Sequence, residues 1–170
     1  MMRYFEDLQI GEMWSLRGAP VDGAEAEDFA RRYDPEYIPP SGVGWIHRGP
    51  QISPWQAAAL GWKLLTELAA AEPVIEATFS RPTDVQWLNR VYVADQLRIE
   101  VELVELFPAA AAMREHGLAR VAVSLITTGP MGFAGWADDD QELVDDIALT
   151  FRASLKARRR ELVSPYHGIS

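Results

Sequence analysis

The hydrophobic pattern changes period after residue 70, and this change most constrains the fold. Residues 53–70 carry apolar side chains on nearly every face of an α-helix, namely Trp55, Ala58, Ala59, Trp62, Leu65 and Leu68, so we expect a long and largely buried helix. Beyond it, apolar and polar residues alternate in 97–103, 118–126 and 147–155, as in a sheet with one face in water. A buried helix followed by antiparallel strands predicts an α+β fold with the sheet wrapped around a central helix.

The remaining elements follow from caps and breakers. Residues 13–19 predict a strand, and Asp22 with Glu25 has the spacing of a capping box that opens a short helix. That helix should bury Phe29 and Ala30 and end before Asp34-Pro35. Ser53 and Gln56 form a second capping box, with Pro54 at the first helical position. We also predict strands at 74–79 and 85–93. Without an internal repeat or linker, we expect one domain at 1–160 and a tail at 161–170.

Composition excludes several classes of function. The chain of 170 residues has a net charge of −9 and no large basic block, which argues against binding to nucleic acid phosphates. It has no cysteine, so disulfides and thiolate chemistry are excluded. Neither an apolar signal segment nor a membrane-spanning stretch of about 20 residues occurs. We therefore expect a soluble, cytoplasmic protein with no membrane contact.

Five fragments, in the correct order, resemble the MaoC-like family of acyl-CoA dehydratases and (R)-specific enoyl-CoA hydratases. They are YFEDLQIG at 4–11, DFARRYDP at 28–35, QISPW at 51–55 and, within one longer match, VQWLNRV at 85–91 and YVADQL at 92–97. The resemblance covers nearly the whole chain. It implies a hot-dog domain that dimerises into a double hot-dog and binds an acyl-CoA in a tunnel at the dimer interface. It also implies a lyase of fatty acid metabolism that takes the coenzyme A thioester as substrate and needs no separate cofactor.

Two catalytic features of the resembled family are missing. Its hydratases carry an aspartate and, five positions later, a histidine, which move protons to and from the substrate. Asp34 matches the aspartate, but Pro39 stands at the histidine position. The glycine whose backbone N–H binds the thioester oxygen is replaced by Pro54, which has no N–H. Because each loss removes a substantial part of the rate, we expect weak or altered hydratase activity.

The candidate catalytic residues each have a structural alternative. Asp34 is either the family aspartate or a turn and capping residue, and Ser53 is either a catalytic hydroxyl or the N-cap of the long helix. His47 could replace the lost histidine only if the loop brings it beside Asp34. His116 and His167 have no partner at ligand spacing, so we expect no metal site.

Aromatic and charged segments leave further alternatives open. Four aromatic side chains either line an acyl pocket or belong to the core, namely Tyr37, Trp55, Trp62 and Trp87. The cluster at 158–160 is either a solvated terminus or an anion site for a CoA phosphate. The insertion at 128–141 packs against a partner subunit, the tunnel mouth or its own sheet.

Three functions fit these observations. The first is an acyl-CoA hydratase or dehydratase relative with impaired chemistry. The second is a non-catalytic hot-dog subunit that pairs with an active paralogue, as a heterodimer in place of a homodimer. The third is a small-molecule binding domain or a thioesterase-like hot-dog, with Asp34 or Glu36 as the candidate base.

Overall fold

The computed structural model describes residues 1–38, 49–107, 115–130 and 143–160. Two helices and five strands form the domain: β1 (Met13–Arg17), α1 (Gly23–Tyr33), α2 (Pro54–Ala71), β2 (Thr78–Trp87), β3 (Gln96–Phe107), β4 (His116–Pro130) and β5 (Leu143–Arg158). Two short 3₁₀ helices, η1 (Phe5–Asp7) and η2 (Pro35–Tyr37), precede β1 and follow α1.

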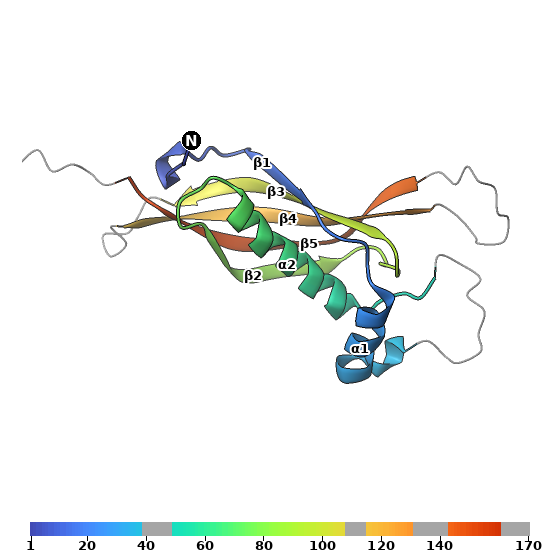
Figure 1. Ribbon diagram of the computed structural model, residues 1–170. Coiled ribbons are helices and arrows are strands. Elements are labelled where there is room, and N and C mark those ends of the chain that lie inside the picture. The colour runs from blue at the N-terminus through green and yellow to red at the C-terminus, as the bar shows by residue number, and fades with distance from the viewer. Residues whose placement is uncertain (39–48, 108–114, 131–142, 161–170) are drawn as a thin grey trace, which may run out of the picture.

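The strands form a single antiparallel sheet in the order β1-β3-β4-β5-β2. Helix α2 lies along one face of this sheet, and α1 lies beyond the N-terminal end of α2 (Figure 1). This arrangement confirms the predicted α+β fold, in which an antiparallel sheet covers a long helix. The two edge strands are β1, with 5 residues, and β2, with 10.

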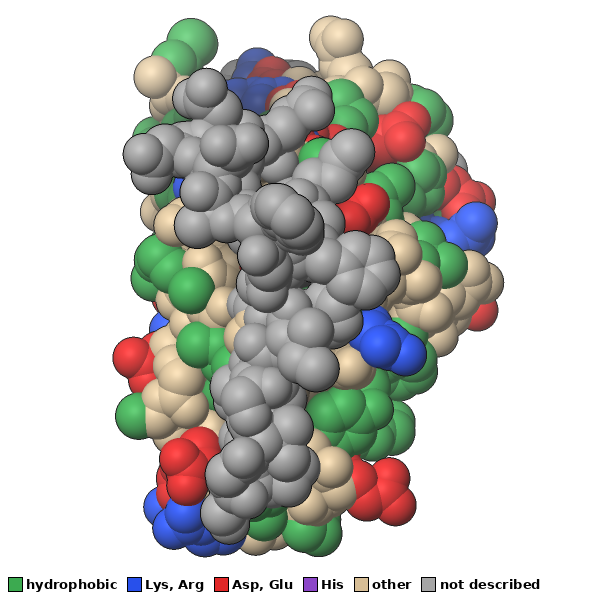
Figure 2. All heavy atoms as spheres, turned by 90° about the vertical axis from the view of Figure 1, so that its right-hand side faces the viewer, with side chains coloured by type: hydrophobic (Ala, Val, Ile, Leu, Met, Phe, Trp, Pro, Cys, Tyr) green, Lys and Arg blue, Asp and Glu red, His purple; other side chains and the backbone are tan. Residues whose placement is uncertain are grey.

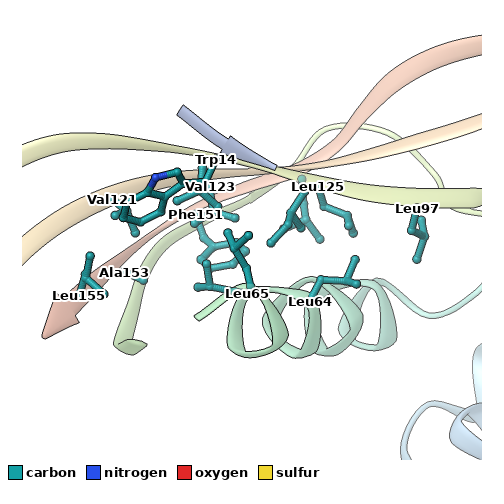
Figure 3. Close-up of a cluster of buried hydrophobic side chains, with 14 of the residues drawn as sticks. Trp14, Leu64, Leu65, Leu97, Val121, Val123, Leu125, Phe151, Ala153 and Leu155 are labelled. Carbon is teal, nitrogen blue, oxygen red and sulfur yellow. The ribbon is translucent and has the colours of Figure 1, made fainter. Parts of the chain in front are cut away.

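The core lies between α2 and the sheet. Leu64 and Leu65 of α2 point toward the sheet, and Val123 and Phe151 point back toward the helix (Figure 3). Every second residue of β3 from Leu97 to Leu103 is buried, as the alternating pattern predicts. The same period holds in most of β4 and β5, so the sequence pattern and the packing agree.

Helix α2 is less buried than the sequence predicts. Trp55 in its first turn is 63% exposed, and Ala59 is exposed as well. The apolar residues do spread around the helix, but in this single chain only one face of α2 has the sheet to pack against. An apolar surface is therefore left open at the start of α2.

The prediction of two strands at 74–79 and 85–93 is wrong. One strand, β2, spans the region between them and pairs with β5 through two register irregularities. Arg81 and Asp84 have positive φ angles of 55° and 53°, which places them in the left-handed region and accounts for the kinked course that sequence alternation cannot show. Residues 88–93 leave the strand and return toward the start of α2, where Tyr92 bridges to Gln51.

No helix within the described ranges is long and apolar enough to cross a membrane.

Candidate functional site

Asp34 and Ser53 meet at the N-terminal end of α2. Ser53 Oγ donates a hydrogen bond of 2.6 Å to Asp34 Oδ2, across 19 positions of sequence. Asp34 ends α1, where its backbone N–H donates to the carbonyl of Ala30 at 2.9 Å. The backbone of Asp34 thus caps α1, while its half-buried carboxylate reaches the next helix. The predicted capping role is confirmed for the backbone only.

The hydroxyl of Ser53 has two partners. Besides donating to Asp34, Ser53 Oγ accepts a bond of 3.1 Å from the N–H of Trp55, which confirms Ser53 as the N-cap of α2. The side chain is 1% exposed. With its proton directed at a carboxylate and its oxygen engaged by the helix, Ser53 fixes the position of Asp34 and is not placed as a free nucleophile.

The capping box predicted for α2 is not formed. Ser53 caps the amide of Trp55 in place of that of Gln56. The side chain of Gln56 is 5% exposed, and within the described ranges its Oε1 has no hydrogen-bond partner. The Ser53 hydroxyl donates to Asp34 and accepts the N–H of Trp55, the second residue of α2. The side chain of Gln56 is turned into the protein interior. The prediction that the Gln56 side chain takes part in a capping box is therefore wrong.

The first two residues of α2 offer no free backbone N–H to an anionic group. Pro54 has no N–H, and that of Trp55 is engaged by Ser53. The N–H of Ala57 donates to the Ser53 carbonyl within the helix. A free helix N-terminus binds anions through such amides, so the Ser-Pro sequence removes the first donor and the cap occupies the second.

Trp55 and Trp87 border this site. Their rings meet edge to face, with centroids 5.0 Å apart at 73°, and Trp87 Nε1 donates to the Pro54 carbonyl at 2.8 Å. Trp87 is 40% exposed. Beside them lies a cleft of about 180 Å³. It is lined by Gln51, Ile52, Pro54, Ala57, Trp87, Leu88, Asn89, Arg90 and Val91. Two of the four predicted pocket aromatics therefore lie together at the start of α2.

The other two aromatics are placed differently. Trp62 packs in the core, with its ring 6.1 Å from that of Phe151. Tyr37 ends η2 and is half-buried; its backbone N–H donates to the Asp34 carbonyl at 3.1 Å. Trp55 and Trp87 therefore lie at the site, and Trp62 packs against the core. Tyr37 lies three residues after Asp34 and contacts its backbone carbonyl.

Several predicted residues lie outside the described residues. Pro39 and His47 fall within 39–48, His167 within 161–170, and most of the insertion at 128–141 within 131–142. His116 is described: its Nε2 lies 2.7 Å from Oε2 of Glu76. This hydrogen bond, followed by the charge of Arg158, lowers the pKa of Glu76 against the opposing effect of burial.

The basic cluster at 158–160 is paired with acidic groups of the same chain. Arg158 contacts Glu76 at 3.1 Å, and Arg159 contacts Glu6 at 2.9 Å. Arg160 binds Asp7 at 2.9 Å. The cluster lies at the far end of the sheet from α1 (Figure 1). Each of the three arginines is therefore paired with a carboxylate of the same chain, while the side chain of Arg160 stays 60% exposed.

The buried acidic residue Asp95 has a structural role. Asp95 is 2% exposed and accepts bonds from Thr127 Oγ1 at 2.7 Å and from the N–H of Tyr92 at 3.0 Å. It closes the turn that leads into β3. In the described part of the chain no cluster of three or more histidine, aspartate or glutamate side chains could hold a metal ion.

The end of the molecule that carries α1 presents hydrophobic side chains among acidic and basic ones (Figure 2). The described residues therefore form a polar pair, Asp34 and Ser53, beside an exposed aromatic pair and a small cleft. Such a site can hold one carboxylate in a fixed position next to an apolar ligand.

No model of a known protein family matches the sequence, and no curated protein matches it either. Solved structures do match in fold. A MaoC-like dehydratase from Rhodospirillum rubrum superposes with a TM-score of 0.63 at 18% identity, covering 94% of this chain and 99% of that one. The (R)-hydratase from A. caviae involved in PHA biosynthesis gives a TM-score of 0.56 at 18% identity, covering 88% and 97%.

A Mycobacterium tuberculosis protein described as having a double hot-dog fold gives a TM-score of 0.54 at 15% identity, covering 99% of this chain and 47% of that one. At these identities the likeness shows the fold alone: the chain has the hot-dog fold.

Proposed function

We propose that this protein binds an acyl thioester at the N-terminal end of α2, as a MaoC-like hot-dog protein with weak or altered hydratase chemistry. The observation that carries the proposal is the hydrogen bond from Ser53 to Asp34. The resemblance assigns Asp34 to the catalytic aspartate, and this bond holds its carboxylate at the start of the central helix. Solved structures with the same fold include a MaoC-like dehydratase and an (R)-hydratase.

The same residues argue against full hydratase activity. Hydration of a 2-enoyl thioester needs a base for water, an acid for the α-carbon and donors for the enolate oxygen. Asp34 supplies one ionisable group, but Pro39 carries no proton. Pro54 offers no N–H, and the N–H of Trp55 is engaged by the cap. Loss of one oxyanion donor costs about 10²–10³ in rate. We therefore expect the protein to bind the thioester but to hydrate it slowly.

Dimerisation is part of the proposal. The outer edge of β2 has no partner strand within the described sheet, and an open edge invites pairing with another chain. Trp55, Trp87 and Leu88 are 63%, 40% and 53% exposed near one end of β2. A second hot-dog, identical or homologous, would cover these side chains and place the cleft beside Trp87 at a subunit interface.

The test combines binding and turnover. Calorimetric titration with crotonyl-CoA should show binding by the wild type, while hydration, followed as the loss of enoyl-thioester absorbance, should stay near background. Asp34→Asn should abolish any residual turnover. The double variant Pro39→His with Pro54→Gly should raise turnover by about 10² or more, because it returns a proton carrier and a backbone donor.

Robust wild-type hydration that is insensitive to Asp34→Asn would contradict the proposal, as would the absence of any thioester binding. Copurification from the native cell separates the two assemblies. A sister chain with an intact aspartate and histidine pair would identify a non-catalytic subunit, whereas a homodimer alone supports a self-contained thioester binder.

A further inference from the structure

Two acidic residues of the N-terminal turn η1 are bound by two arginines that follow β5. Glu6 Oε1 accepts the Nε–H of Arg159 at 2.9 Å, and Glu6 Oε2 accepts the backbone N–H of Arg160 at 2.9 Å. Both carboxylate oxygens of Asp7 accept from Nη2 of Arg160, at 2.9 and 3.0 Å. Guanidinium and backbone N–H groups are the donors with which proteins hold anionic ligands. The turn therefore meets these arginines as an anionic ligand would.

The arginines border an open cleft of about 510 Å³ at the end of the sheet opposite α1 (Figure 1). This volume lies in the range of small-molecule sites, about 300–1,000 Å³. The cleft is lined by Tyr4, Ile75, Glu76, Arg158, Arg159 and Arg160. The guanidinium of Arg160 lies 5.3 Å from the centre of the Tyr4 ring. Glu76 is itself engaged by Arg158 at 3.1 Å and by His116 at 2.7 Å. The cleft thus offers a small ligand a wall of guanidinium groups and one aromatic ring.

The ion pairs between η1 and the arginines are partly open to water. The side chains of Arg159 and Arg160 are 33% and 60% exposed, and those of Glu6 and Asp7 are 38% and 35% exposed. Exposed ion pairs contribute little to stability, because water screens them. A guanidinium has several N–H groups, and among the described residues a carboxylate engages only one side-chain nitrogen of each of these two arginines. An incoming anion therefore finds unused donors beside carboxylates that are weakly held.

We propose that Arg159 and Arg160 form a site for a diphosphate group, and that the acidic turn η1 occupies this site as an internal competitor. Two linked phosphates place their charges on adjacent groups, as the neighbouring carboxylates of η1 do. Phosphate oxygens match the guanidinium fork as carboxylate oxygens do, and a phosphate group carries more charge. The contact between η1 and the end of β5 is then autoinhibitory, because the ligand binds by displacing the two carboxylates. This site is separate from the thioester site and needs none of its chemistry.

Titration with inorganic pyrophosphate at constant ionic strength tests the site. In calorimetry, the double variant Glu6→Gln with Asp7→Asn should bind pyrophosphate about tenfold more tightly than the wild type, because two exposed ion pairs no longer compete. Adding Arg159→Gln and Arg160→Gln to this variant should weaken binding at least about tenfold, because the donors are lost. In the wild type, pyrophosphate should shift the NMR signal of the Arg159 Nε–H group.

Helix α1 supplies a control of the same composition. Glu27 pairs with Arg31 and Asp28 pairs with Arg32, all through exposed side chains. The double variant Glu27→Gln with Asp28→Asn changes the net charge by the same amount at the other end of the molecule. It should leave the affinity for pyrophosphate unchanged.

Three results would overturn the proposal. Pyrophosphate could bind neither the wild type nor the double variant of η1, or the α1 variant could gain as much affinity, which would show a general effect of charge. NMR shifts confined to residues around Asp34 and Trp55 would place the anion at the other site. Thermal melts check that the η1 variant is folded. If it is not, Glu6→Gln alone keeps the bond from the Tyr4 N–H to Asp7 and should gain about threefold; no gain in this variant also overturns the proposal.

ADP distinguishes the two sources of a diphosphate group. Tighter binding of ADP than of pyrophosphate, lost in Tyr4→Leu, would support the site and identify a nucleotide as its ligand. Equal or weaker binding of ADP, with pyrophosphate binding as expected, would support the site and identify an inorganic anion.

Discussion

The contact between Ser53 and Asp34 makes a quantitative prediction about stability. Replacing Ser53 by alanine removes the oxygen that caps the Trp55 amide and the proton donor of the Asp34 carboxylate. Loss of a serine N-cap costs about 1 kcal/mol, and a hydrogen bond to a charged group contributes about 1.5–3 kcal/mol. Since Asp34 is only half-buried, the lower part of this range applies. We expect Ser53→Ala to lower the free energy of unfolding by about 2–3 kcal/mol.

A double-mutant cycle separates the two contributions. In the background of Asp34→Ala, the serine still caps the helix but has lost its carboxylate, so Ser53→Ala should then cost only about 1 kcal/mol. The difference, about 1–2 kcal/mol, is the coupling between the two side chains. The matched control is Thr66→Ala on the same helix. The exposed hydroxyl of Thr66 donates to the Lys63 carbonyl, and its loss should cost less than about 0.5 kcal/mol.

Urea unfolding followed by circular dichroism measures these values, provided that the m-value stays constant across the four proteins. For a domain of this length, the loss in Ser53→Ala corresponds to about 4–12 °C in Tm. A coupling energy below about 0.3 kcal/mol would show that the bond does not hold Asp34 in place. The reasoning that gives Asp34 a fixed position would then be wrong.

Three further predictions concern the scaffold. Ala94 has a φ of 70°, so Ala94→Gly should raise the free energy of unfolding by about 1 kcal/mol in urea titrations. A Cβ at Gly117 would lie 2.2 Å from the Phe5 ring, so Gly117→Ala should lower Tm through an overpacking cost of about 1–3 kcal/mol. Hydrogen bonding to Arg3 lowers the pKa of Glu12. The stability from that pair is therefore present above the ordinary glutamate pKa and is lost as pH falls through the lowered value. Thermal melts from pH 6 to pH 3 should show a weaker acid dependence in Glu12→Gln.

The sequence predicts strands correctly where one face of the strand is buried, because burial makes apolar and polar residues alternate. The strands at 97–103, 118–126 and 147–155 each have one face on α2 and the other in water, so alternation alone locates β3, β4 and β5. It fails at β2, an edge strand that is exposed over most of its length. Apolar alternation cannot mark a strand that buries little, and the positive φ angles at Arg81 and Asp84 are not visible in side-chain types.

The candidate site is predicted less completely, because its decisive contact is between helices. Asp34 and Ser53 each have a local explanation as capping residues, and both local explanations hold in part. Neither capping pattern indicates that the two side chains meet, since they are 19 positions apart. For Gln56 the local rule is misleading: its spacing from Ser53 suits a capping box, yet the serine proton goes to Asp34 and the glutamine turns inward.

Ser53 both caps α2 and donates to Asp34, so the presence of Asp34 has a structural explanation. Its hydroxyl joins the end of α1 to the start of α2, so the pair contributes to the fold whether or not any thioester reacts there. A chain that had lost its proton carrier at position 39 would still keep the pair for stability. Asp34 alone is therefore weak support for turnover. The distinguishing experiment measures both stability and thioester binding in Asp34→Asn. The free energy of unfolding should fall whether or not the site is functional. Thioester binding or turnover should fall only if the carboxylate faces a ligand.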